Sequence, residues 1–421
     1  MTSKFSLSFP FFFFFFFFFL SPVSAQRLSS IDLAALRDIK NCLTEIPAAE
    51  FFTTWDFASP AVDPCVSFAG VTCSGSPRRV VTLMLGSGLS ESPRLAGTLS
   101  PSIGNLSELT QLVLFSGIVT GPIPEQLGSL TNLRVLSLTN NRLTGSIPAA
   151  IFGLPNLHTL DLSRNELTGP VPGVTRLTEL RVMILAGNQL SGEFPAELPG
   201  GLLHLDLSEN ELSGELPYHL PPSLRYLSVS VNQMWGPLNG LESSSLSELV
   251  YLDLSMNRFG GPIPPNLFRT SLASVFLQRN NFSGGVHTQP QSPLPYAAGS
   301  VLDLSHNSLT GEIPAALAGA ESVFLNNNRF VGTVPPEYFR SVYGGVTKTL
   351  YLQHNFITGF PAVEERGSPI PLPDSVTLCL SYNCAVPQLP AGSMTCPASA
   401  GEQLSRPPSQ CSLFNNASHA G

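Results

Sequence analysis

The chain has 421 residues, only 12% of them charged, and its formal net charge is −8. Its three lysines lie far apart, at Lys4, Lys40 and Lys348, and no basic stripe is present, which argues against a nucleic-acid partner. After residue 25 no stretch reaches about 18 consecutive apolar residues, so we expect no membrane span in the mature protein.

Residues 1–25 have the features of a secretory signal peptide. A phenylalanine-rich run, Phe11–Leu20, precedes the small residues Val23 and Ala25, which suit a cleavage site after Ala25. The run is too short for a transmembrane helix. We therefore expect a secreted, extracellular protein, and seven cysteines suit that oxidising compartment. Three sequons are candidate glycosylation sites, at Asn105, Asn281 and Asn416.

Residues 26–79 are predicted to form an N-terminal cap. Ser29 or Ser30 can begin a helix whose apolar residues recur at helical spacing, at Leu33, Leu36, Ile39 and Leu43. Three aromatic residues then supply a hydrophobic plug: Phe51, Phe52 and Trp55. A disulfide between Cys65 and Cys73 would stabilise the cap by about 2–4 kcal/mol. A solenoid needs such an element because its end exposes an apolar cross-section.

From Val80 the sequence repeats itself about every 25 residues, which is the period of a solenoid. The frame LxxLxLxxN occurs thirteen times within residues 80–383. The copies, numbered one to thirteen, begin at Val80, Leu109, Leu133, Leu157, Leu180, Leu202, Leu224, Leu249, Leu272, Gly299, Ala320, Thr347 and Ser375.

Within each copy, positions 4 and 6 are apolar and alternate with the outward positions 3, 5 and 7, as in a strand with one buried face. In the third copy, Leu136 and Leu138 are therefore predicted to point into the core. Strands from successive copies are expected to stack into one parallel sheet.

Position 9 is asparagine in eleven copies and a glycine, Gly88 or Gly117, in the first two. The asparagine amide carries donors and an acceptor, so stacked side chains can satisfy buried backbone groups of neighbouring coils. The predicted ladder consists of Asn141, Asn165, Asn188, Asn210, Asn232, Asn257, Asn280, Asn307, Asn328, Asn355 and Asn383.

The second half of many copies reads LTGxIP, as in Leu143–Pro148. Glycine permits a backbone turn there, and proline suits an edge or a turn. Three copies carry irregular segments rich in glycine and proline, which we interpret as tolerated insertions. These segments are Gly86–Gly97, His287–Gly299 and Phe360–Asp374.

The motif LxxLxLxxNxLTGxIPxxL, repeated in Leu133–Pro195 and around Leu302–Leu317, resembles that of plant extracellular leucine-rich-repeat proteins. This class includes receptor-kinase ectodomains, receptor-like proteins and polygalacturonase-inhibiting proteins. The segment DPCVSFAGVTC is similar to the N-terminal cap of the class, although Phe68 stands where tryptophan is usual. The resemblance implies an α/β solenoid, a leucine-rich-repeat superhelix with a parallel concave sheet and disulfide-bearing caps. It also implies a second short strand or turn at TGxIP and a convex helical piece in each copy.

Residues 384–421 are predicted to form a C-terminal cap and tail. Four cysteines near this end can pair in three ways, namely Cys379, Cys384, Cys396 and Cys411. Cys379 occupies outward position 5 and Cys384 follows the ladder asparagine, which argues against a bond between these two. Cys42 is then the odd cysteine, which we interpret as a buried free thiol in the cap helix rather than an intermolecular bridge.

Signatures of catalysis are missing from the sequence. It has no nucleophile elbow, P-loop, zinc-protease motif or protein-kinase motif, and its histidines lack metal-ligand spacing. Aspartates recur at outward position 5, within the tetrapeptide LDLS that is common in repeats of this kind. We therefore interpret these side chains as solvated: Asp161, Asp206, Asp253 and Asp303. We expect no enzymatic activity, cofactor or metal.

Recognition is the remaining function, and the outward positions 3, 5, 7 and 8 are the candidates for it. Copies nine to twelve place aromatic and arginine side chains there, which commonly anchor interfaces. We predict a ligand-contact surface that consists of Phe276, Gln278, Arg279, His306, Phe324, Asn326, Tyr351, Gln353 and His354.

We therefore expect a secreted recognition protein in the apoplast or cell wall. Its leading function is that of a receptor-like or co-receptor-like module that binds a peptide, protein or glycan in signalling or defence, with a membrane receptor kinase as signalling partner. The alternative is an inhibitor of a secreted cell-wall hydrolase, similar to polygalacturonase-inhibiting proteins. A third function, that of a cell-wall structural protein, is disfavoured because the tail lacks serine–polyproline repeats.

Overall fold

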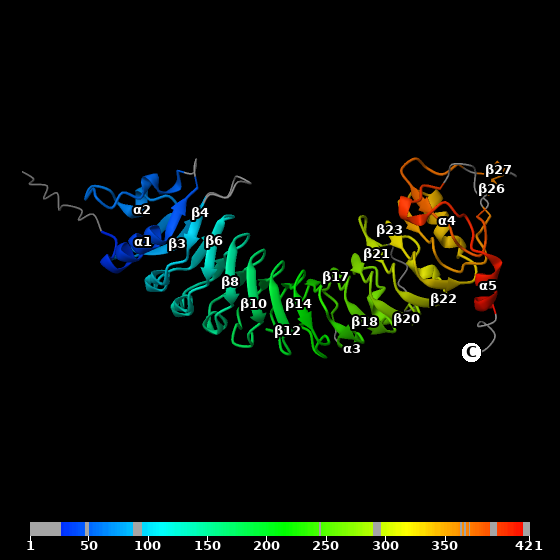
Figure 1. Cartoon of the computed structure of the whole chain (residues 1–421), viewed down its shortest axis with the longest axis horizontal. Helices are drawn as coiled ribbons and strands as arrows, with labels where there is room; N and C mark the ends of the chain where they lie inside the picture. The colour runs from blue at the N-terminus through cyan, green and yellow to red at the C-terminus, as the bar shows by residue number, and fades with distance from the viewer. Residues whose placement is uncertain are drawn as a thin grey trace, which may run out of the picture.

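The structure, a computed structural model, describes residues 27–46, 50–86, 95–243, 246–288, 296–362, 364–365, 368–369, 371–387 and 394–415. These residues form a curved solenoid whose two ends are the tips of an arc (Figure 1). The predicted solenoid, with its parallel sheet and disulfide-bearing caps, is confirmed. The predicted signal peptide, Gly88 and Asn416 lie outside the described residues.

Each of the thirteen copies contributes one strand to a 14-stranded sheet that lines the inner side of the arc (Figure 1). Neighbouring strands are parallel, except that β2 of the cap (Val71–Ser74) runs antiparallel to β3. The strands of the copies are β3 (Arg79–Leu85), β5 (Gln111–Leu114), β7 (Val135–Ser137), β9 (Thr159–Asp161), β11 (Val182–Ile184), β13 (His204–Asp206), β15 (Tyr226–Ser228), β17 (Tyr251–Asp253), β19 (Ser274–Phe276), β21 (Val301–Asp303), β23 (Ser322–Phe324), β25 (Thr349–Tyr351) and β28 (Thr377–Cys379).

The burial predicted for positions 4 and 6 is present in every coil. In the third copy, Leu136 and Leu138 are fully buried. Val135, which precedes them, and Ser137, which lies between them, remain partly exposed. The buried leucines of successive coils form one continuous hydrophobic core along the solenoid. Burial of such side chains is worth roughly 1.5–3 kcal/mol each, so the core is shared by neighbouring coils and has no single centre.

The asparagines at position 9 make the predicted contacts between coils. The Oδ1 atom of Asn165 accepts a hydrogen bond from the backbone N–H of Leu143 in the preceding copy, at 3.1 Å. Its Nδ2 atom donates to the carbonyl of Leu138, also in the preceding copy, at 2.9 Å. The same two kinds of bond recur at each ladder asparagine through Asn383. At Gly117 a β-carbon would lie only 2.7 Å from the Leu95 carbonyl oxygen, which explains the glycine there.

Position 8 adopts a left-handed backbone in eleven of the copies that the structure describes, which the sequence pattern does not indicate. Residues such as Asn140, Arg164 and Glu209 have φ values of 54–56°. In this conformation the Asn140 N–H reaches the Ser163 carbonyl of the next copy at 2.9 Å. The turn takes the chain away from the concave sheet, so side chains at position 8 lie at its edge.

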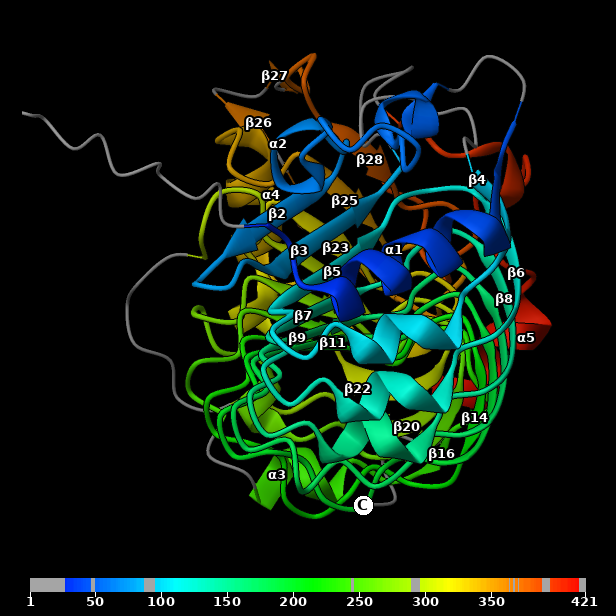
Figure 2. The same cartoon turned by 90° about the vertical axis from the view of Figure 1, so that its left-hand side faces the viewer.

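A second set of short strands follows the asparagines, on a different side of the coil from the concave sheet (Figure 2). One sheet has seven strands: β1 (Leu43–Glu45), β4 (Leu95–Thr98), β6 (Ile118–Pro122), β8 (Arg142–Ser146), β10 (Glu166–Pro170), β12 (Gln189–Glu193) and β14 (Glu211–Ser213). Another has five: β16 (Trp235–Gly236), β18 (Arg258–Gly261), β20 (Asn281–Gly285), β22 (Ser308–Glu312) and β24 (Arg329–Val331). Both match the second strand that the TGxIP segment predicts.

Short helical segments complete most of the coils. They are η2 (Pro101–Asn105), η3 (Glu125–Ser129), η4 (Ala149–Gly153), α3 (Asn239–Ser243), η5 (Pro265–Leu267), η6 (Ala315–Leu317) and α4 (Pro336–Tyr343). A two-stranded hairpin, β26 (Glu364–Glu365) with β27 (Ser368–Pro369), lies within the third irregular segment. The other two irregular segments fall largely outside the described residues. Within the described chain, no helix is long and apolar enough to cross a membrane.

Helix α1 (Ser30–Cys42) lies across the N-terminal end of the solenoid, with η1 (Phe51–Thr54) and α2 (Pro64–Ser67) beside it (Figure 2). Asp32 in its first turn is fully buried, which the sequence pattern does not indicate. Its carboxylate pairs with the Arg79 guanidinium at 2.9 Å and accepts the Val80 N–H at 2.8 Å. A buried charge needs such partners, so this pair fixes the cap onto the first copy.

The aromatic plug of the cap is built around Trp55, which is fully buried and donates its indole N–H to the Ala69 carbonyl at 3.0 Å. Phe68 stacks on Trp55 with ring centroids 5.2 Å apart, so it fills the position where the class usually has tryptophan. The Cys65–Cys73 disulfide closes the loop between α2 and β2. Cys42 is a free thiol, but it is half-buried rather than buried, because it ends helix α1.

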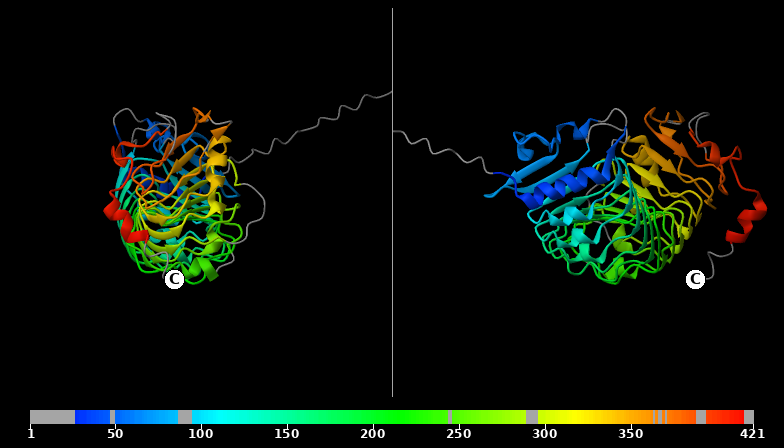
Figure 3. Two further views of the ribbon diagram at one scale, coloured as in Figure 1. Left: turned by 90° about the vertical axis from the view of Figure 1, so that its right-hand side faces the viewer. Right: turned by 60° about the vertical axis from the view of Figure 1, so that its left-hand side comes forward.

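The C-terminal segment closes the other end of the solenoid (Figure 3). Two disulfides, Cys379–Cys396 and Cys384–Cys411, join the last copy to η7 (Ala398–Ala400) and α5 (Pro408–Asn415). Cys379 and Cys384 are therefore not paired with each other, as the sequence argued. The Arg406 guanidinium lies 4.6 Å from the Tyr382 ring centroid and anchors the segment to the last copy.

Substitution of a single ladder asparagine tests the role of the ladder in stability. Asn210→Ala would leave the buried N–H of Leu190 without its acceptor. We expect a loss of about 1–3 kcal/mol in the free energy of unfolding, because an unpaired buried donor retains its full desolvation cost. Urea denaturation of the purified protein measures this loss. The exposed Asn156, changed to Ala, is the control and should cost less than about 0.5 kcal/mol.

The buried pair of the cap predicts a second stability difference. Asp32→Ala should destabilise the protein by about 3–5 kcal/mol, because it leaves the Arg79 charge without its partner. The exposed pair Glu337–Arg340, at 2.7 Å, provides the control, and Glu337→Ala should cost no more than about 1 kcal/mol. Equal thermal denaturation curves for the two variants would contradict a structural role of Asp32.

Candidate functional site

The candidate site is the outward face of the concave sheet, where positions 3, 5 and 7 of successive copies form three parallel rows. The strands are in register, so Tyr226 lies opposite His204 on one side and opposite Tyr251 on the other. Side chains that share a position number are therefore direct neighbours, about 4.8 Å apart in backbone spacing.

An aromatic row occupies position 3 of copies six to eight. The rings of His204 and Tyr226 stack with centroids 4.0 Å apart and an angle of 3° between their planes. Tyr226 and Tyr251 stack in the same way, at 4.3 Å and 4°. Phe276, at position 5 of copy nine, extends the row at 5.5 Å from Tyr251, with its ring tilted by 48°. The row thus crosses four consecutive strands.

Stacking and partial burial change the acid–base properties of the row. Burial, together with the carboxylates of Asp206 and Asp253, raises the pKa of Tyr226. Burial and Asp253 also raise the pKa of Tyr251. Both hydroxyl groups therefore stay protonated and remain hydrogen-bond donors. Burial lowers the pKa of His204, which favours its neutral form even though Asp206 and Asp161 lie nearby.

Four aspartates lie at position 5 beside the aromatic row, in copies four, six, eight and ten: Asp161, Asp206, Asp253 and Asp303. One carboxylate oxygen of Asp206 accepts both the backbone N–H of Ser208, at 3.0 Å, and its hydroxyl, at 2.6 Å. Asp161 and Asp253 bind Ser163 and Ser255 in the same way. These bonds fix the carboxylates in place. Burial raises the pKa of Asp303.

Two small residues separate the taller side chains in copy seven. Ser228, at position 5, is only 2% exposed, and Ser230, at position 7, is 8% exposed, although both belong to the outward face. Strand register places Ser228 between Asp206 and Asp253. Neighbouring side chains therefore cover both serines, and neither of them projects from the concave face.

The predicted contact surface in copies nine to twelve is only partly available. Phe276 belongs to the aromatic row, and Phe324 contacts Tyr351 edge to face with ring centroids 5.3 Å apart. Arg279 and His306 are exposed at the left-handed position 8. Gln278 is partly exposed, although its Oε1 atom is buried without a hydrogen-bond partner in the described chain.

Three of the predicted contact residues are buried or are bound within the protein. Gln353 is 2% exposed and Asn326 is 8% exposed, so their assignment as contact residues is corrected. His354 Nε2 lies 3.0 Å from the Ala400 carbonyl of the C-terminal cap, and burial lowers its pKa. For His354 the physical reason is that the C-terminal cap folds back over the last two copies, where Cys396 bonds to Cys379 at outward position 5. Asn326 lies in copy eleven and donates instead to the adjacent Asn327 side chain at 2.9 Å.

The central aromatic row is the part of the site that the sequence prediction missed. The signal was available, because His204, Tyr226 and Tyr251 occupy the same position 3 in three consecutive copies. The row is visible only when the residues at one position of successive copies are compared, because each copy by itself contributes a single ring. The aspartates carry a similar signal, since they recur in every second copy.

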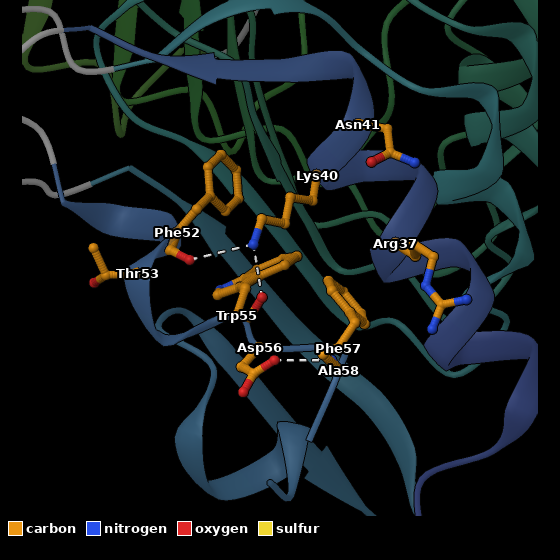
Figure 4. Close-up of a pocket in the computed structure, with 9 residues that line it drawn as sticks. All are labelled: Arg37, Lys40, Asn41, Phe52, Thr53, Trp55, Asp56, Phe57 and Ala58. Atoms are coloured by element: carbon orange, nitrogen blue, oxygen red, sulfur yellow. Dashed lines mark hydrogen bonds between the residues drawn. The ribbon is translucent and has the colours of Figure 1, made fainter. Parts of the chain in front are cut away.

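A depression in the N-terminal cap is a weaker candidate. Arg37, Lys40 and Asn41 of α1 face Phe52–Ala58 across it (Figure 4). The Lys40 amine already donates to the Trp55 carbonyl at 2.7 Å and lies 5.7 Å from the Phe57 ring centroid. The Lys40 ammonium group therefore already has its partners within the cap. Elsewhere in the described residues, no cluster of three or more His, Cys, Asp or Glu side chains is arranged to hold a metal ion.

Three family descriptions match parts of the chain. "Leucine rich repeat" matches residues 107–167 and 131–190, and a second description of the same repeat matches residues 201–222, 248–269 and 300–320. "Leucine rich repeat N-terminal domain" matches residues 29–74, which contain helix α1 and the Cys65–Cys73 disulfide. The matches thus cover the cap and most of the regular copies.

Known proteins with similar chains come from plants. Receptor-like protein 6 of Arabidopsis thaliana is 39% identical over 101 residues, which are 23% of this chain and 10% of that protein. The structure of PEPR1 with AtPEP1 has a TM-score of 0.60 at 27% identity and covers 79% of this chain and 51% of PEPR1. The plant peptide hormone receptor RGFR1, in complex with RGF2, has a TM-score of 0.54 at 26% identity, over 69% of this chain and 50% of RGFR1.

This chain spans about half the length of those two structures and about a tenth of the curated relative. The agreement extends from the cap sequence to the stacking of the coils, and it holds for both kinds of comparison. The chain is therefore a leucine-rich-repeat solenoid that is similar, in its cap, its repeats and its fold, to the plant extracellular class.

Proposed function

We propose that this protein is a secreted, non-enzymatic, receptor-like module that binds an extended peptide along the central copies of its concave face. One observation carries the proposal: His204, Tyr226 and Tyr251 form a continuous aromatic row on the outward side of three adjacent strands. Tyrosine anchors binding surfaces because its large ring loses little conformational entropy and its hydroxyl group still makes hydrogen bonds.

The stacking geometry favours a peptide over a glycan. A sugar ring packs on the face of an aromatic ring, but in this row the faces of Tyr226 are covered by its two neighbours at 4.0 and 4.3 Å. What the row offers is ring edges and hydroxyl groups. Such a surface suits backbone carbonyls and compact side chains of a peptide that runs along the solenoid axis.

Comparison with known proteins supports the same class of ligand. RGFR1, which is 26% identical to this chain, is a plant peptide hormone receptor. Gln353 is buried and the C-terminal cap binds His354, so a ligand on this chain would lie between the aromatic row and the pair Phe324–Tyr351. For signalling we propose a membrane receptor kinase as partner.

Loss of the aromatic row should abolish most of the binding. Tyr226→Ala combined with Tyr251→Ala removes both hydroxyl donors and the central rings, and we expect at least about a 30-fold loss of affinity. The measurement is capture of peptides from apoplastic fluid on the immobilised protein, quantified by mass spectrometry. Trp235→Ala is the control, because Trp235 is equally large and half-exposed but lies on the second sheet, in β16. Unchanged capture by the folded double variant would refute the proposal.

The pair Phe324 and Tyr351 tests how far the site extends. If the ligand reaches copies eleven and twelve, Phe324→Ala with Tyr351→Ala should weaken capture by about tenfold, because an edge-to-face aromatic pair is lost from the contact area. Full retention of binding by this variant would restrict the site to copies six to ten. Both variants should unfold at the same urea concentration as the native protein.

Inhibition of a cell-wall hydrolase makes a different prediction. Under our proposal the purified protein should not reduce the activity of a secreted fungal pectinase, because its concave face is organised for a narrow ligand. Stoichiometric inhibition of the pectinase, lost in the Tyr226→Ala, Tyr251→Ala variant, would replace the peptide proposal with the inhibitor function.

A further inference from the structure

We infer that the ligand of the concave face is a polyproline II peptide with a cationic side chain at every third residue. This inference rests on the proposed function and specifies the chemistry of its ligand. It is carried by two observations: the spacing of the acidic side chains along the sheet, and the stacked aromatic rings beside them.

The acidic side chains alternate along the sheet. Asp161 and Asp206 flank Ile184 on the two adjacent strands, and each is in register with it at position 5. Asp206 and Asp253 flank Ser228 in the same way. Neighbouring strands are about 4.8 Å apart, so the carboxylates recur about every 9.6 Å along the solenoid axis. Asp303 continues the series beyond Phe276.

Only one common backbone conformation presents charges at this spacing on one side. A polyproline II helix has three residues per turn and rises about 3.1 Å per residue, so every third side chain lies on the same face about 9.3 Å further on. In a β-strand every third side chain points to the opposite face, and every second one is only about 6.7 Å away. In an α-helix, side chains seven residues apart lie on the same face, about 10.5 Å from each other. Their mismatch with the carboxylate spacing grows with each repeat.

The aromatic row complements the backbone of such a helix. A polyproline II chain has no internal hydrogen bonds, so its carbonyl groups are free acceptors. The Tyr226 and Tyr251 hydroxyl groups bond to each other, and Tyr251 also bonds to Asp253, so the stacked rings present their edges to a ligand beside Asp206 and Asp253. Aromatic surfaces recur where proteins bind proline-rich segments, because the ligand is already extended and loses little entropy.

The surroundings of the acidic side chains leave room for cations. Ser228 and Ser230 are buried beneath their neighbours, so neither position 5 nor position 7 of copy seven projects between Asp206 and Asp253. For Asp161 and Asp206, the hydrogen bonds from serine reach only Oδ1, and no bond to Oδ2 is formed within the described chain. Arg279 lies near Asp303 and partly neutralises it, so the first three carboxylates dominate.

Two synthetic peptides of identical composition test the inference. The matched peptide is acetyl-(Lys-Pro-Pro)3-Lys-amide, which places four lysines at every third residue over about 28 Å. The control peptide, acetyl-(Lys-Pro)4-Pro-Pro-amide, contains the same four lysines and six prolines, with a lysine at every second residue. Calorimetric titration at about 0.15 M salt should show at least tenfold tighter binding of the matched peptide, because non-specific attraction is the same for both.

A pair of variants assigns the effect to the concave face. Asp206→Asn with Asp253→Asn keeps the acceptors for Ser208 and Ser255, and it should lower affinity for the matched peptide about tenfold and make the two peptides equal. Glu193→Gln with Glu215→Gln removes the same charge from the exposed second face of the neighbouring coils and should change neither affinity.

The outcomes separate this inference from the proposed function. Equal binding of the two peptides by the native protein, or no binding of either, overturns the inference. If the native protein then still captures apoplastic peptides through Tyr226 and Tyr251, peptide recognition stands and only the polyproline II class is wrong. If capture fails as well, both are wrong.

Discussion

The register between neighbouring coils is the constraint on which the rest of this protein depends, and the asparagine ladder maintains it. Each ladder side chain bonds to a backbone N–H and a backbone carbonyl of the preceding copy, as Asn188 does with Leu167 and Leu162. These groups are buried, so an amide that did not reach them would leave unpaired polar atoms in the core. The ladder therefore holds each coil in a fixed register relative to the preceding coil.

Fixed register converts a periodic sequence into rows of side chains. His204, Tyr226 and Tyr251 are separated by more than twenty residues each in the sequence, yet their rings stack within 4.3 Å. Neither stacking nor the alternation of aspartates could arise if one coil slipped by a residue, because position 3 would then turn inward. The contact surface is thus a property of several copies together, while each copy alone contributes only one or two outward residues.

The caps do more than cover the apolar ends of the solenoid. At the N-terminal end, Asp32 and Arg79 join helix α1 to the first strand of the repeats through a buried pair. At the other end, the bond from Cys396 to Cys379 crosses the outward face of the last copy. This cap shortens the accessible concave face and moves its functional part toward the middle of the arc, where the aromatic row lies.

The sequence by itself determined the architecture. The leucines at positions 4 and 6, the asparagine at position 9 and the glycine of LTGxIP each impose a local conformation, and thirteen repetitions of them permit only stacked coils. Buried Asp32 and the left-handed position 8 escaped the prediction, because both are set by contacts with a neighbouring coil or cap. Only the tertiary structure decided which outward residues are available, since Gln353 at position 7 and Phe324 at position 5 both face outward in the repeat, yet Gln353 is buried and Phe324 is partly exposed. His354 is bound by a C-terminal segment whose path follows from two disulfides that four cysteines alone leave undetermined.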